Sequence, residues 1–282
     1  MVNLKELRKW AVSELEKCGN DSPVADVDYI LAHLLGFKKN DIVFGDKLVD
    51  VNQKKLFDNA LLRLTSGEPV QYVVGGCEFM SLWFEVNSST LIPRSDTEIL
   101  VELLIYTAKT RDELNIFEIG TGSGCIAVSL AHYLPKARIV SADISTEALN
   151  TAGENADRLG VADKCEFVQC DIMKEFPAFD KLPDIVVSNP PYIPHNDIAG
   201  LEDKVKLHEP LSALDGGCDG LDFYRRIAED VPMSADGILA FEVGIGQAQD
   251  VVKIMSGRFY NIEIHRDIAG IERVVTGRLK KD

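Results

Sequence analysis

The sequence lacks the features that mark a membrane, secreted or zinc-binding protein. No stretch approaches the ~18 uninterrupted apolar residues that a transmembrane helix needs. Residues 1–6 do not contain the apolar core of a secretory signal. The six cysteines form no C-x-x-C pair. We therefore expect a cytoplasmic protein with reduced thiols, no metal site and no membrane association.

Positive charge is scarce in the larger part of the chain. The 282 residues carry 30 Lys and Arg against 45 Asp and Glu, a formal net charge of -15. Residues 1–75 hold 10 basic and 11 acidic residues. Residues 76–282 therefore hold 20 basic and 34 acidic residues, a net charge of -14. Duplex nucleic acid is bound largely through clustered Lys and Arg, and this balance therefore argues against stable binding of nucleic acid. It favours a protein partner with a basic surface.

Hydrophobic periodicity divides the chain into three parts. Residues 1–69 carry apolar residues at helical spacing, which predicts a small helical bundle. Residues 70–92 change to alternation with period two, which predicts a β-hairpin linker. Residues 93–282 form the third part. The helices expected in the bundle cover residues 4–15, 24–35 and 52–64.

The third part has the pattern of one α/β domain. It opens with Ser95 and Glu98, which are spaced as a capping box before a helix. Strands and helices then alternate, as in a doubly wound, mostly parallel sheet of seven strands. The last two strands have no helix between them and predict an antiparallel pair at the sheet edge. The expected strands cover residues 115–119, 138–142, 165–169, 184–188, 237–242, 259–264 and 272–277. The expected helices cover residues 125–133, 145–159, 221–230 and 247–255.

A glycine turn follows the first of these strands, at the edge where open α/β sheets bind ligands. Glycines let the backbone approach a ligand closely and adopt positive φ. Cys125 stands where a dinucleotide fingerprint has its third glycine, and the Glu118 carboxylate would repel a pyrophosphate but attract an ammonium group. A plain corner between strand and helix would also explain the turn. The residues of this candidate site are Glu118, Gly120, Thr121, Gly122, Ser123 and Gly124.

The next two strand ends carry acids that complete a candidate ligand site. Asp143 lies 19 residues after Gly124, close to the ~20 expected of an acid that binds ribose hydroxyls. It could equally cap the next helix, a role that Ser145 could also fill. Asp171 and Ile172 offer an acceptor and an apolar face for a base, although Asp171 alone would pass for a loop residue. Together with Glu118, these positions predict S-adenosylmethionine as the ligand.

The tetrapeptide Asn-Pro-Pro-Tyr at residues 189–192 follows the fourth strand. Pro190 and Pro191 remove two backbone donors, so the preceding carbonyls are left without partners facing a cleft. The Asn189 side chain adds one acceptor and two donors. The result is a polar clamp for a planar NH2 group, although a plain strand-ending turn is the alternative interpretation.

These motifs and their flanks resemble the HemK/PrmC family of class I, Rossmann-like methyltransferases over nearly the whole chain. Members methylate the side-chain amide nitrogen of a glutamine, in the Gly-Gly-Gln motif of peptide-chain release factors, with S-adenosylmethionine. The most specific segments are PVQYVVG at 69–75, LIPRSDTE at 91–98, EP at 209–210, GGCDGL at 216–221 and DIAG at 267–270. The family commonly has proline where Ser95 stands and often an aromatic residue where Ile172 stands.

The resemblance implies a role for each candidate residue. Gly120 to Gly124 and Asp143 would bind S-adenosylmethionine, with Ile172 beside the adenine. Glu118 and Asp171, singled out above by their own chemistry, and Asn189 are expected to contact the same ligand. The glutamine would be held by Arg94, Asn189, Pro190, Pro191 and Tyr192. The expected catalytic residues are Asn189, Pro190 and Tyr192: the Asn189 oxygen and the Pro190 carbonyl accept hydrogen bonds from the amide, and Tyr192 packs on its plane. No strong general base is evident in the sequence.

Other functions would need parts of the same site. An N6-adenine nucleic-acid methyltransferase would use the same clamp, but it would also need base flipping and a basic surface. A glutamine methyltransferase of a ribosomal protein and a non-catalytic S-adenosylmethionine-binding adaptor are further alternatives. We expect a monomer, with residues 193–210 as a polar loop that orders when the protein substrate docks. His195 and His208 are expected to be solvated loop residues.

Overall fold

A computed structural model describes residues 1–109, 111 and 113–281. Two compact units divide the chain. The first combines Met1–Gly76 with Glu202–His208, and the second combines Cys77–Leu201 with the chain from Glu209 onward. In the described part of the chain, no helix has both the length and the hydrophobicity needed to cross a bilayer.

The first unit is a helical bundle around a small apolar core. Its helices are α1 (Leu4–Lys17), α2 (Pro23–Tyr29), the π-helical turn η1 (Ile30–Leu34), α3 (Lys39–Val43), α4 (Val51–Thr65) and α5 (Val70–Val74), and a short antiparallel pair joins β1 (Val2–Asn3) to β2 (Leu48–Val49). Helix α4 begins with a capping box between Asp50 and Gln53. The three predicted helices are confirmed as α1, α2 continued by η1, and α4.

The predicted strand at residues 70–74 is wrong, because this segment forms helix α5. Its apolar residues pack into the core of the helical unit, and the Arg63 guanidinium donates hydrogen bonds to the carbonyls of Tyr72 (3.0 Å) and Val73 (3.1 Å) at the helix end. Tertiary packing therefore overrides the local alternation. The hairpin is shorter than predicted and joins β3 (Gly76–Phe79) to β4 (Leu82–Glu85).

The second unit is built on the predicted seven-stranded sheet. Its strands are β5 (Leu114–Ile119), β6 (Ala137–Asp143), β7 (Cys165–Gln169), β8 (Ile185–Ser188), β9 (Ile238–Glu242), β10 (Phe259–Arg266) and β11 (Glu272–Leu279). The spatial order is β10-β11-β9-β8-β5-β6-β7. Five strands run parallel, and β11 pairs antiparallel with both β9 and β10. Each predicted strand and the antiparallel pair at the edge are confirmed.

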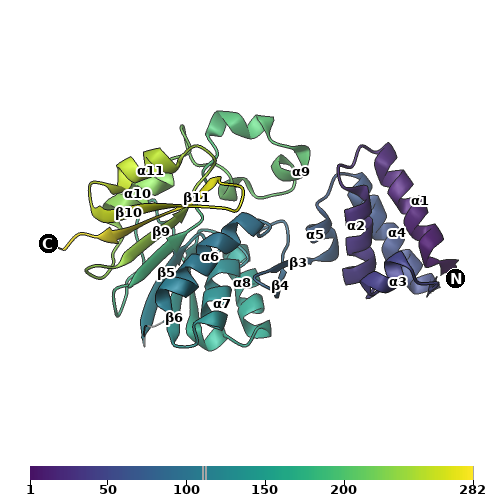
Figure 1. Ribbon diagram of the computed structural model, residues 1–282, viewed down its shortest axis with the longest axis horizontal. Coiled ribbons are helices and arrows are strands. Elements are labelled where there is room, and N and C mark those ends of the chain that lie inside the picture. Colours follow the sequence, from purple (N-terminus) through teal and green to yellow (C-terminus); the bar gives the residue numbers. More distant parts are fainter. Residues whose placement is uncertain (110, 112, 282) are drawn as a thin grey trace. The chain divides into compact units, whose positions relative to one another are not determined.

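Helices cover both faces of this sheet (Figure 1). Helices α6 (Ser95–Ala108), α7 (Cys125–Tyr133) and α8 (Thr146–Arg158) pack on one face, and α10 (Asp222–Asp230) and α11 (Ala248–Met255) pack on the other. The chain leaves β5 toward β6 and later returns to β8 on the opposite side of β5. Ligands bind at such a reversal of strand order in open α/β sheets. The fold therefore places a site at the carboxyl ends of β5 and β8.

Two capping predictions have different outcomes. The capping box at Ser95 and Glu98 is wrong: Arg94 occupies the N-cap of α6 without a side-chain cap, and Glu98 Oε1 accepts a hydrogen bond from the Met80 N–H at 2.6 Å. Ser145 is the N-cap of α8, and its hydroxyl accepts from the Ala148 N–H at 3.1 Å.

The remaining described elements are short helical turns: η2 (Ala162–Lys164), η3 (His195–Gly200), α9 (Asp203–Lys206) and η4 (Leu211–Ala213).

Candidate active site

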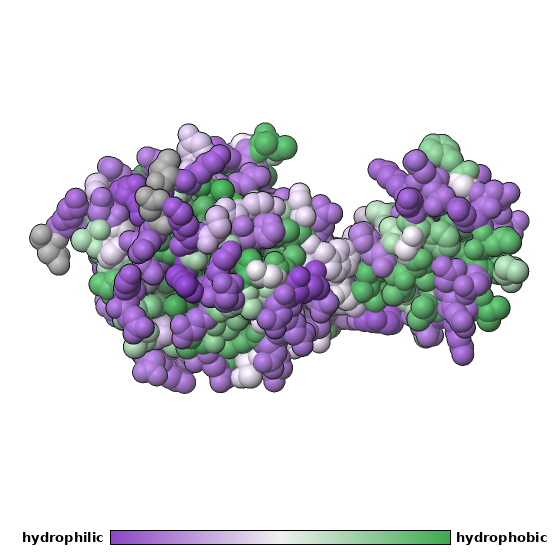
Figure 2. Space-filling view, turned by 90° about the horizontal axis from the view of Figure 1, so that it is seen from below, coloured by the Kyte–Doolittle hydropathy of each residue, from purple (hydrophilic) through white to green (hydrophobic). Residues whose placement is uncertain are grey.

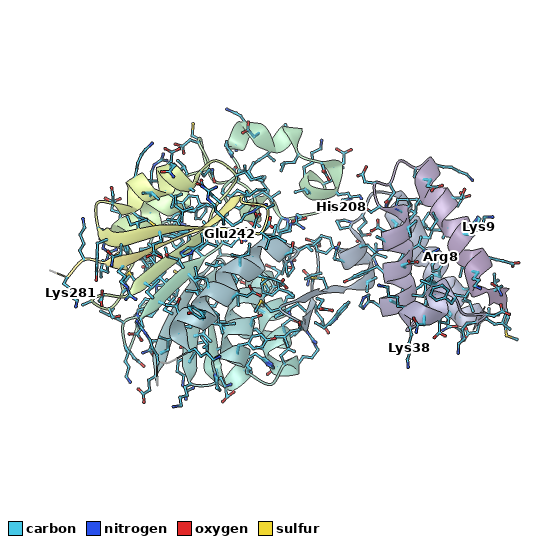
Figure 3. All side chains as sticks on the ribbon, in the orientation of Figure 1. Arg8, Lys9, Lys38, His208, Glu242 and Lys281 are labelled. Atoms are coloured by element: carbon cyan, nitrogen blue, oxygen red, sulfur yellow. The ribbon has the colours of Figure 1, made fainter. Side chains whose placement is uncertain are left out.

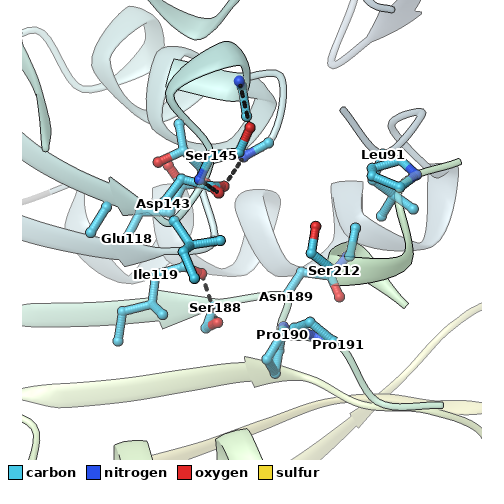
Figure 4. A pocket seen from close by; sticks show the side chains of 18 of the residues that line it. Leu91, Glu118, Ile119, Asp143, Ser145, Ser188, Asn189, Pro190, Pro191 and Ser212 are labelled. Carbon is cyan, nitrogen blue, oxygen red and sulfur yellow. Dashed lines mark hydrogen bonds between the residues drawn. The ribbon is translucent and has the colours of Figure 1, made fainter. Parts of the chain in front are cut away.

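A cavity of about 320 Å³ lies at the carboxyl ends of β5, β6 and β8, within the second unit. Its size is that of a small-molecule site. Its lining includes most of the residues singled out in the sequence: Arg94, Glu118, the turn 120–123, Asp143, Asp171, Ile172, Asn189, Pro190 and Pro191. In Figure 4, Asp143 and Ser145 lie toward one side of the cavity and Leu91 and Ser212 toward the other, with Asn189 between them.

The glycine turn after β5 is held against the neighbouring strand. The N–H groups of Gly120 and Thr121 donate to the Ala142 carbonyl at 2.8 and 3.2 Å. Gly124 has a φ of 77°, and a Cβ there would come 2.8 Å from the Ala152 Cβ of α8. Glycine is therefore needed at position 124 for both conformation and packing, and it contacts α8 rather than the cavity.

Asp143 braces this turn through both oxygens of its carboxylate. Oδ2 accepts a hydrogen bond from the Gly122 N–H at 2.9 Å, and Oδ1 accepts from the Ser145 N–H at 2.9 Å. Asp171 pairs with Lys174 at 2.9 Å, and this hydrogen bond lowers the pKa of its carboxyl. Asp143 and Asp171 both line the cavity, as the sequence predicted.

Glu118 is fully buried at the end of β5 and lines the cavity. Its Oε2 accepts a 2.5 Å hydrogen bond from the Ser141 hydroxyl. Its other oxygen, Oε1, has no partner among the described residues. Burial raises the pKa of this carboxyl to about 8, and the hydrogen bond from Ser141 opposes this rise only in part. A buried polar atom without a partner is uncommon in proteins, which singles out Oε1 as an acceptor left available at the cavity.

The Asn-Pro-Pro-Tyr turn leaves β8 and is fixed from several directions. Asn189 Nδ2 donates to the Thr97 hydroxyl at 3.2 Å. The Gln247 side-chain amide donates to the Tyr192 carbonyl at 2.9 Å. A Cβ at Gly216 would come 2.7 Å from the Pro191 carbonyl oxygen, so this glycine allows the chain to lie directly on the turn.

Comparisons with known proteins show which proteins this chain resembles. Residues 6–75 match the PrmC N-terminal domain, and residues 95–203 match the methyltransferase small domain. A release factor glutamine methyltransferase of Bacillus cereus is 35% identical over 99% of this chain and 100% of its own length. One of Moorella thermoacetica is 43% identical over 77% of each chain.

The chain belongs to the release factor glutamine methyltransferase family. A solved methyltransferase of Pyrococcus furiosus shares the fold, with a TM-score of 0.52 and 12% identity over 79% of this chain and 100% of that one. The predicted class I methyltransferase fold, with an N-terminal helical part, and the resemblance to the HemK/PrmC family are confirmed.

Tyr192 occupies a different place from the other clamp residues. It is absent from the described lining of the cavity, and its ring lies beside the Gly244 backbone in the core on the α10 face. Burial raises the pKa of its hydroxyl to about 12. Stacking of Tyr192 on the substrate amide therefore stays a prediction.

Sequence reasoning missed the residues behind Asn189. Glu242, the last residue of β9, is 3% exposed and contacts Thr97 and Asn189, and burial raises its pKa to about 7. Its position at the end of a buried strand is the same signal that singled out Glu118. Phe223 on α10 was also missed, although it lines the cavity together with Ile172.

Arg94 lines the cavity and forms an ion pair with Glu209. Its Nη2 lies 2.5 Å from Glu209 Oε1, while the other Glu209 oxygen has no partner in the described chain. Burial raises the pKa of Glu209, and the facing guanidinium opposes this shift. Arg94 thus lies where substrate binding was predicted, but it also neutralises a buried acid.

The segment after the clamp is folded against the glycine-rich stretch that follows it. The Ile193 N–H donates to the Leu214 carbonyl at 3.0 Å, and the His195 N–H donates to the Gly217 carbonyl at 2.8 Å. His195 is exposed and pairs with Asp215 at 2.7 Å through Nδ1. The exposure of His195 agrees with its prediction as a loop residue.

Proposed function

We propose that this protein transfers a methyl group from S-adenosylmethionine to the side-chain amide nitrogen of a glutamine, in the Gly-Gly-Gln motif of a peptide-chain release factor. The names of its relatives and the resemblance of its motifs support this substrate. The observation that carries the proposal is the arrangement at Asn189. Its NH2 group donates a hydrogen bond to Thr97, and its oxygen, which has no partner among the described residues, can accept from a planar amide in the cavity.

The residues around the cavity fit S-adenosylmethionine. The unpartnered Glu118 Oε1 suits an ammonium group, and the remaining acceptor capacity of Asp143 suits ribose hydroxyls. Ile172 and Phe223 give apolar surface for a purine. When bound, S-adenosylmethionine supplies an electrophilic methyl group on its sulfonium.

The clamp would work by orientation and by charge. Two acceptors, the Asn189 side-chain oxygen and the Pro190 carbonyl, would hold the amide NH2 in one plane and stabilise positive charge as it develops on nitrogen. Fixing the nucleophile in this way lowers the entropic part of the barrier. The nitrogen gains the methyl group and then releases one proton to water. No basic side chain needs to remove this proton first.

The helical unit is the proposed docking surface for the release factor. Apolar side chains gather on the face seen in Figure 2. The exposed apolar residues of the helical unit include Trp10, Val43, Phe44, Leu48, Val51, Leu56 and Leu62. Residues 1–75 carry almost no net charge, so this surface suits a protein partner better than a nucleic acid. We propose that a cytoplasmic monomer is the acting form.

One experiment tests the proposed function. Labelled S-adenosylmethionine is incubated with the enzyme and a purified release factor, beside a release factor with Gln→Ala in its Gly-Gly-Gln loop. We expect label on the first protein and none on the second. Asn189→Ala should nearly abolish transfer while it leaves affinity for S-adenosylmethionine within about threefold. Label on DNA or on a ribosomal protein instead, or an active Asn189→Ala enzyme, would refute the proposal.

A further inference from the structure

Glu242 is a buried acid that stands behind the clamp rather than in the cavity. It ends β9, next to β8, and is 3% exposed (Figure 3). The described lining of the cavity includes Asn189 and Thr97 but not Glu242. A group in this position does not touch a bound substrate. It acts on the reaction only through the side chains in front of it.

Two side chains in front of Glu242 are donors to its carboxylate. Ser188 of β8 pairs with Phe241 of β9, so the residues that follow them, Asn189 and Glu242, lie side by side at the strand ends. Thr97, from α6, and Asn189 both lower the pKa of Glu242 as hydrogen-bond donors. Asn189 Nδ2 also donates to the Thr97 hydroxyl at 3.2 Å. The Thr97 hydroxyl has one proton, which must be directed away from Asn189 while the hydroxyl accepts from the Asn189 NH2 group. The donors of Thr97 and Asn189 are thus directed toward the side on which Glu242 lies.

This direction decides which end of the Asn189 amide faces the cavity. An Asn side chain can turn by 180° and exchange its oxygen for its NH2 with little change in shape. A carboxylate behind it stabilises only the NH2 end and repels the oxygen. The oxygen is then turned toward the cavity, where an NH2 group of the substrate needs an acceptor.

We propose that Glu242 is a positioning residue that, as a carboxylate, holds the Asn189 amide with its oxygen toward the substrate. This inference rests on the proposed function, since it assigns a reason for the orientation of the clamp. Protonated Glu242 loses its charge and becomes a donor, so it no longer distinguishes the two ends of the amide. The clamp is therefore most active when Glu242 is ionised.

The surroundings of Glu242 allow this charge to change near neutral pH. Burial disfavours the carboxylate and raises its pKa to about 7. Arg273 on β11 favours ionisation, but it also pairs with Asp96 at 2.9 Å and Asp267 at 3.1 Å, so its charge is shared. The Glu242 Oε2 atom has no partner within the described residues. The titratable and charged groups that face Glu242 are Asp96, Arg273, Tyr192, Tyr224 and Cys125, with Asp267 behind Arg273.

The test compares Glu242→Gln with the wild type from pH 5.5 to 8.5. For the wild type, we expect kcat to rise through about pH 7. In Glu242→Gln, we expect kcat at pH 8 to fall about 10- to 100-fold, and the rise near pH 7 to disappear. The KM for the release factor and the affinity for S-adenosylmethionine should change less than threefold. Asp184→Asn is the matched control at the opposite end of the sheet, where Asp184 accepts from the Asn115 N–H at 3.0 Å. It should keep the wild-type pH profile.

A second readout is independent of catalysis. The side-chain NH2 signals of Asn189 in the ¹⁵N NMR spectrum, assigned by their loss in Asn189→Ala, should be protected from solvent exchange at pH 8 in the wild type. Protection should be lost in Glu242→Gln. A variant with wild-type kcat and pH profile, or with Asn189 still protected, would overturn the inference. If no glutamine is methylated but Asn189 is protected through Glu242, the proposed function fails and the positioning role stands.

Discussion

The Asp143 carboxylate and the Gly122 backbone N–H form a 2.9 Å hydrogen bond that ties the end of β6 to the glycine turn after β5. The same carboxylate accepts from the Ser145 N–H at the start of α8. Asp143 thus organises the turn, in addition to the role in ligand binding that we propose for it.

This relationship predicts the effect of two substitutions. Asp143→Ala leaves both N–H groups without their acceptor, so we expect a loss of about 1–3 kcal/mol in the free energy of unfolding and a marked loss of affinity for S-adenosylmethionine. Asp143→Asn keeps one acceptor and should be less severe in both respects. Urea denaturation and isothermal titration calorimetry measure the two effects. A variant Asp143→Ala with wild-type affinity would show that the acid only braces the turn.

The raised pKa of Glu118 predicts that ligand binding depends on pH. Because its pKa is raised to about 8 in the free protein, a cationic ligand must bind the ionised form and shift this pKa downward. Affinity for S-adenosylmethionine should therefore weaken as pH falls below about 8, with release of protons on binding. Calorimetry in buffers of different ionisation enthalpy measures this release, and Glu118→Gln should abolish it. Proton release that persists in Glu118→Gln would assign it to another group.

The same residue predicts how stability depends on pH. The folded-state pKa of Glu118 lies above that of an unfolded carboxyl, so its contribution is fully present below about pH 4.5 and is lost as pH rises toward 8. The free energy of unfolding of the ligand-free protein should fall over this window by up to about 1.4 kcal/mol per pH unit from this group. Glu118→Gln should flatten the curve. An unchanged slope in this variant would mean that Glu118 is ionised throughout.

The close packing of Gly216 on the clamp predicts that a larger residue there lowers activity by displacing the clamp backbone. A methyl group at this position would come 2.7 Å from the Pro191 carbonyl oxygen and 2.8 Å from the Tyr192 Cα. Gly216→Ala should therefore displace the turn and lower kcat by about 10²-fold, with little effect on affinity for S-adenosylmethionine. Gly257→Ala is the control, because nothing lies within 4 Å of a Cβ there. Full activity of Gly216→Ala would refute the role of this close approach.

The pair Arg94–Glu209 predicts an asymmetric effect on stability. Arg94→Met leaves Glu209 buried without its cation, which we expect to cost about 1–2 kcal/mol, below the value for a fully buried pair because Arg94 is 39% exposed. Arg94→Met combined with Glu209→Gln should recover most of this loss. Lys253→Met, which breaks an exposed pair with Asp250, should change stability by less than 0.5 kcal/mol, an order-of-magnitude bound for surface pairs. Chemical denaturation at pH 7.5 measures all three, and a double variant as unstable as Arg94→Met would contradict this account.

Local patterns in the sequence predict most of the fold. The strands β5, β6 and β8 are central strands that are buried over most of their length, so their runs of apolar residues reveal them. The glycine turn and the prolines at 190–191 are equally local. Their positions after these strands were enough to bring them to one cavity.

What the sequence did not reveal depends on contacts between distant residues. Thr97 and Asn189 are 92 positions apart, and nothing near Thr97 indicates that its hydroxyl accepts from the clamp. Glu98 has a capping-box spacing, but its carboxylate instead binds the Met80 N–H. At Val70 and Tyr72 the alternation suggested a strand, whereas packing in the helical unit produced a helix. Each error comes from tertiary partners that outweigh a local preference.

The compact unit of the N-terminal helices is discontinuous in the chain, since Glu202–His208 belongs to it. Lys204 lies 4.0 Å from Asp21, and a Cβ at Gly67 would lie 4.0 Å from the His208 imidazole. A hybrid enzyme that takes only residues 1–76 from a relative would therefore pair foreign helices with seven native residues. Exchange of the unit between species should preserve its fold best when both pieces are transplanted together.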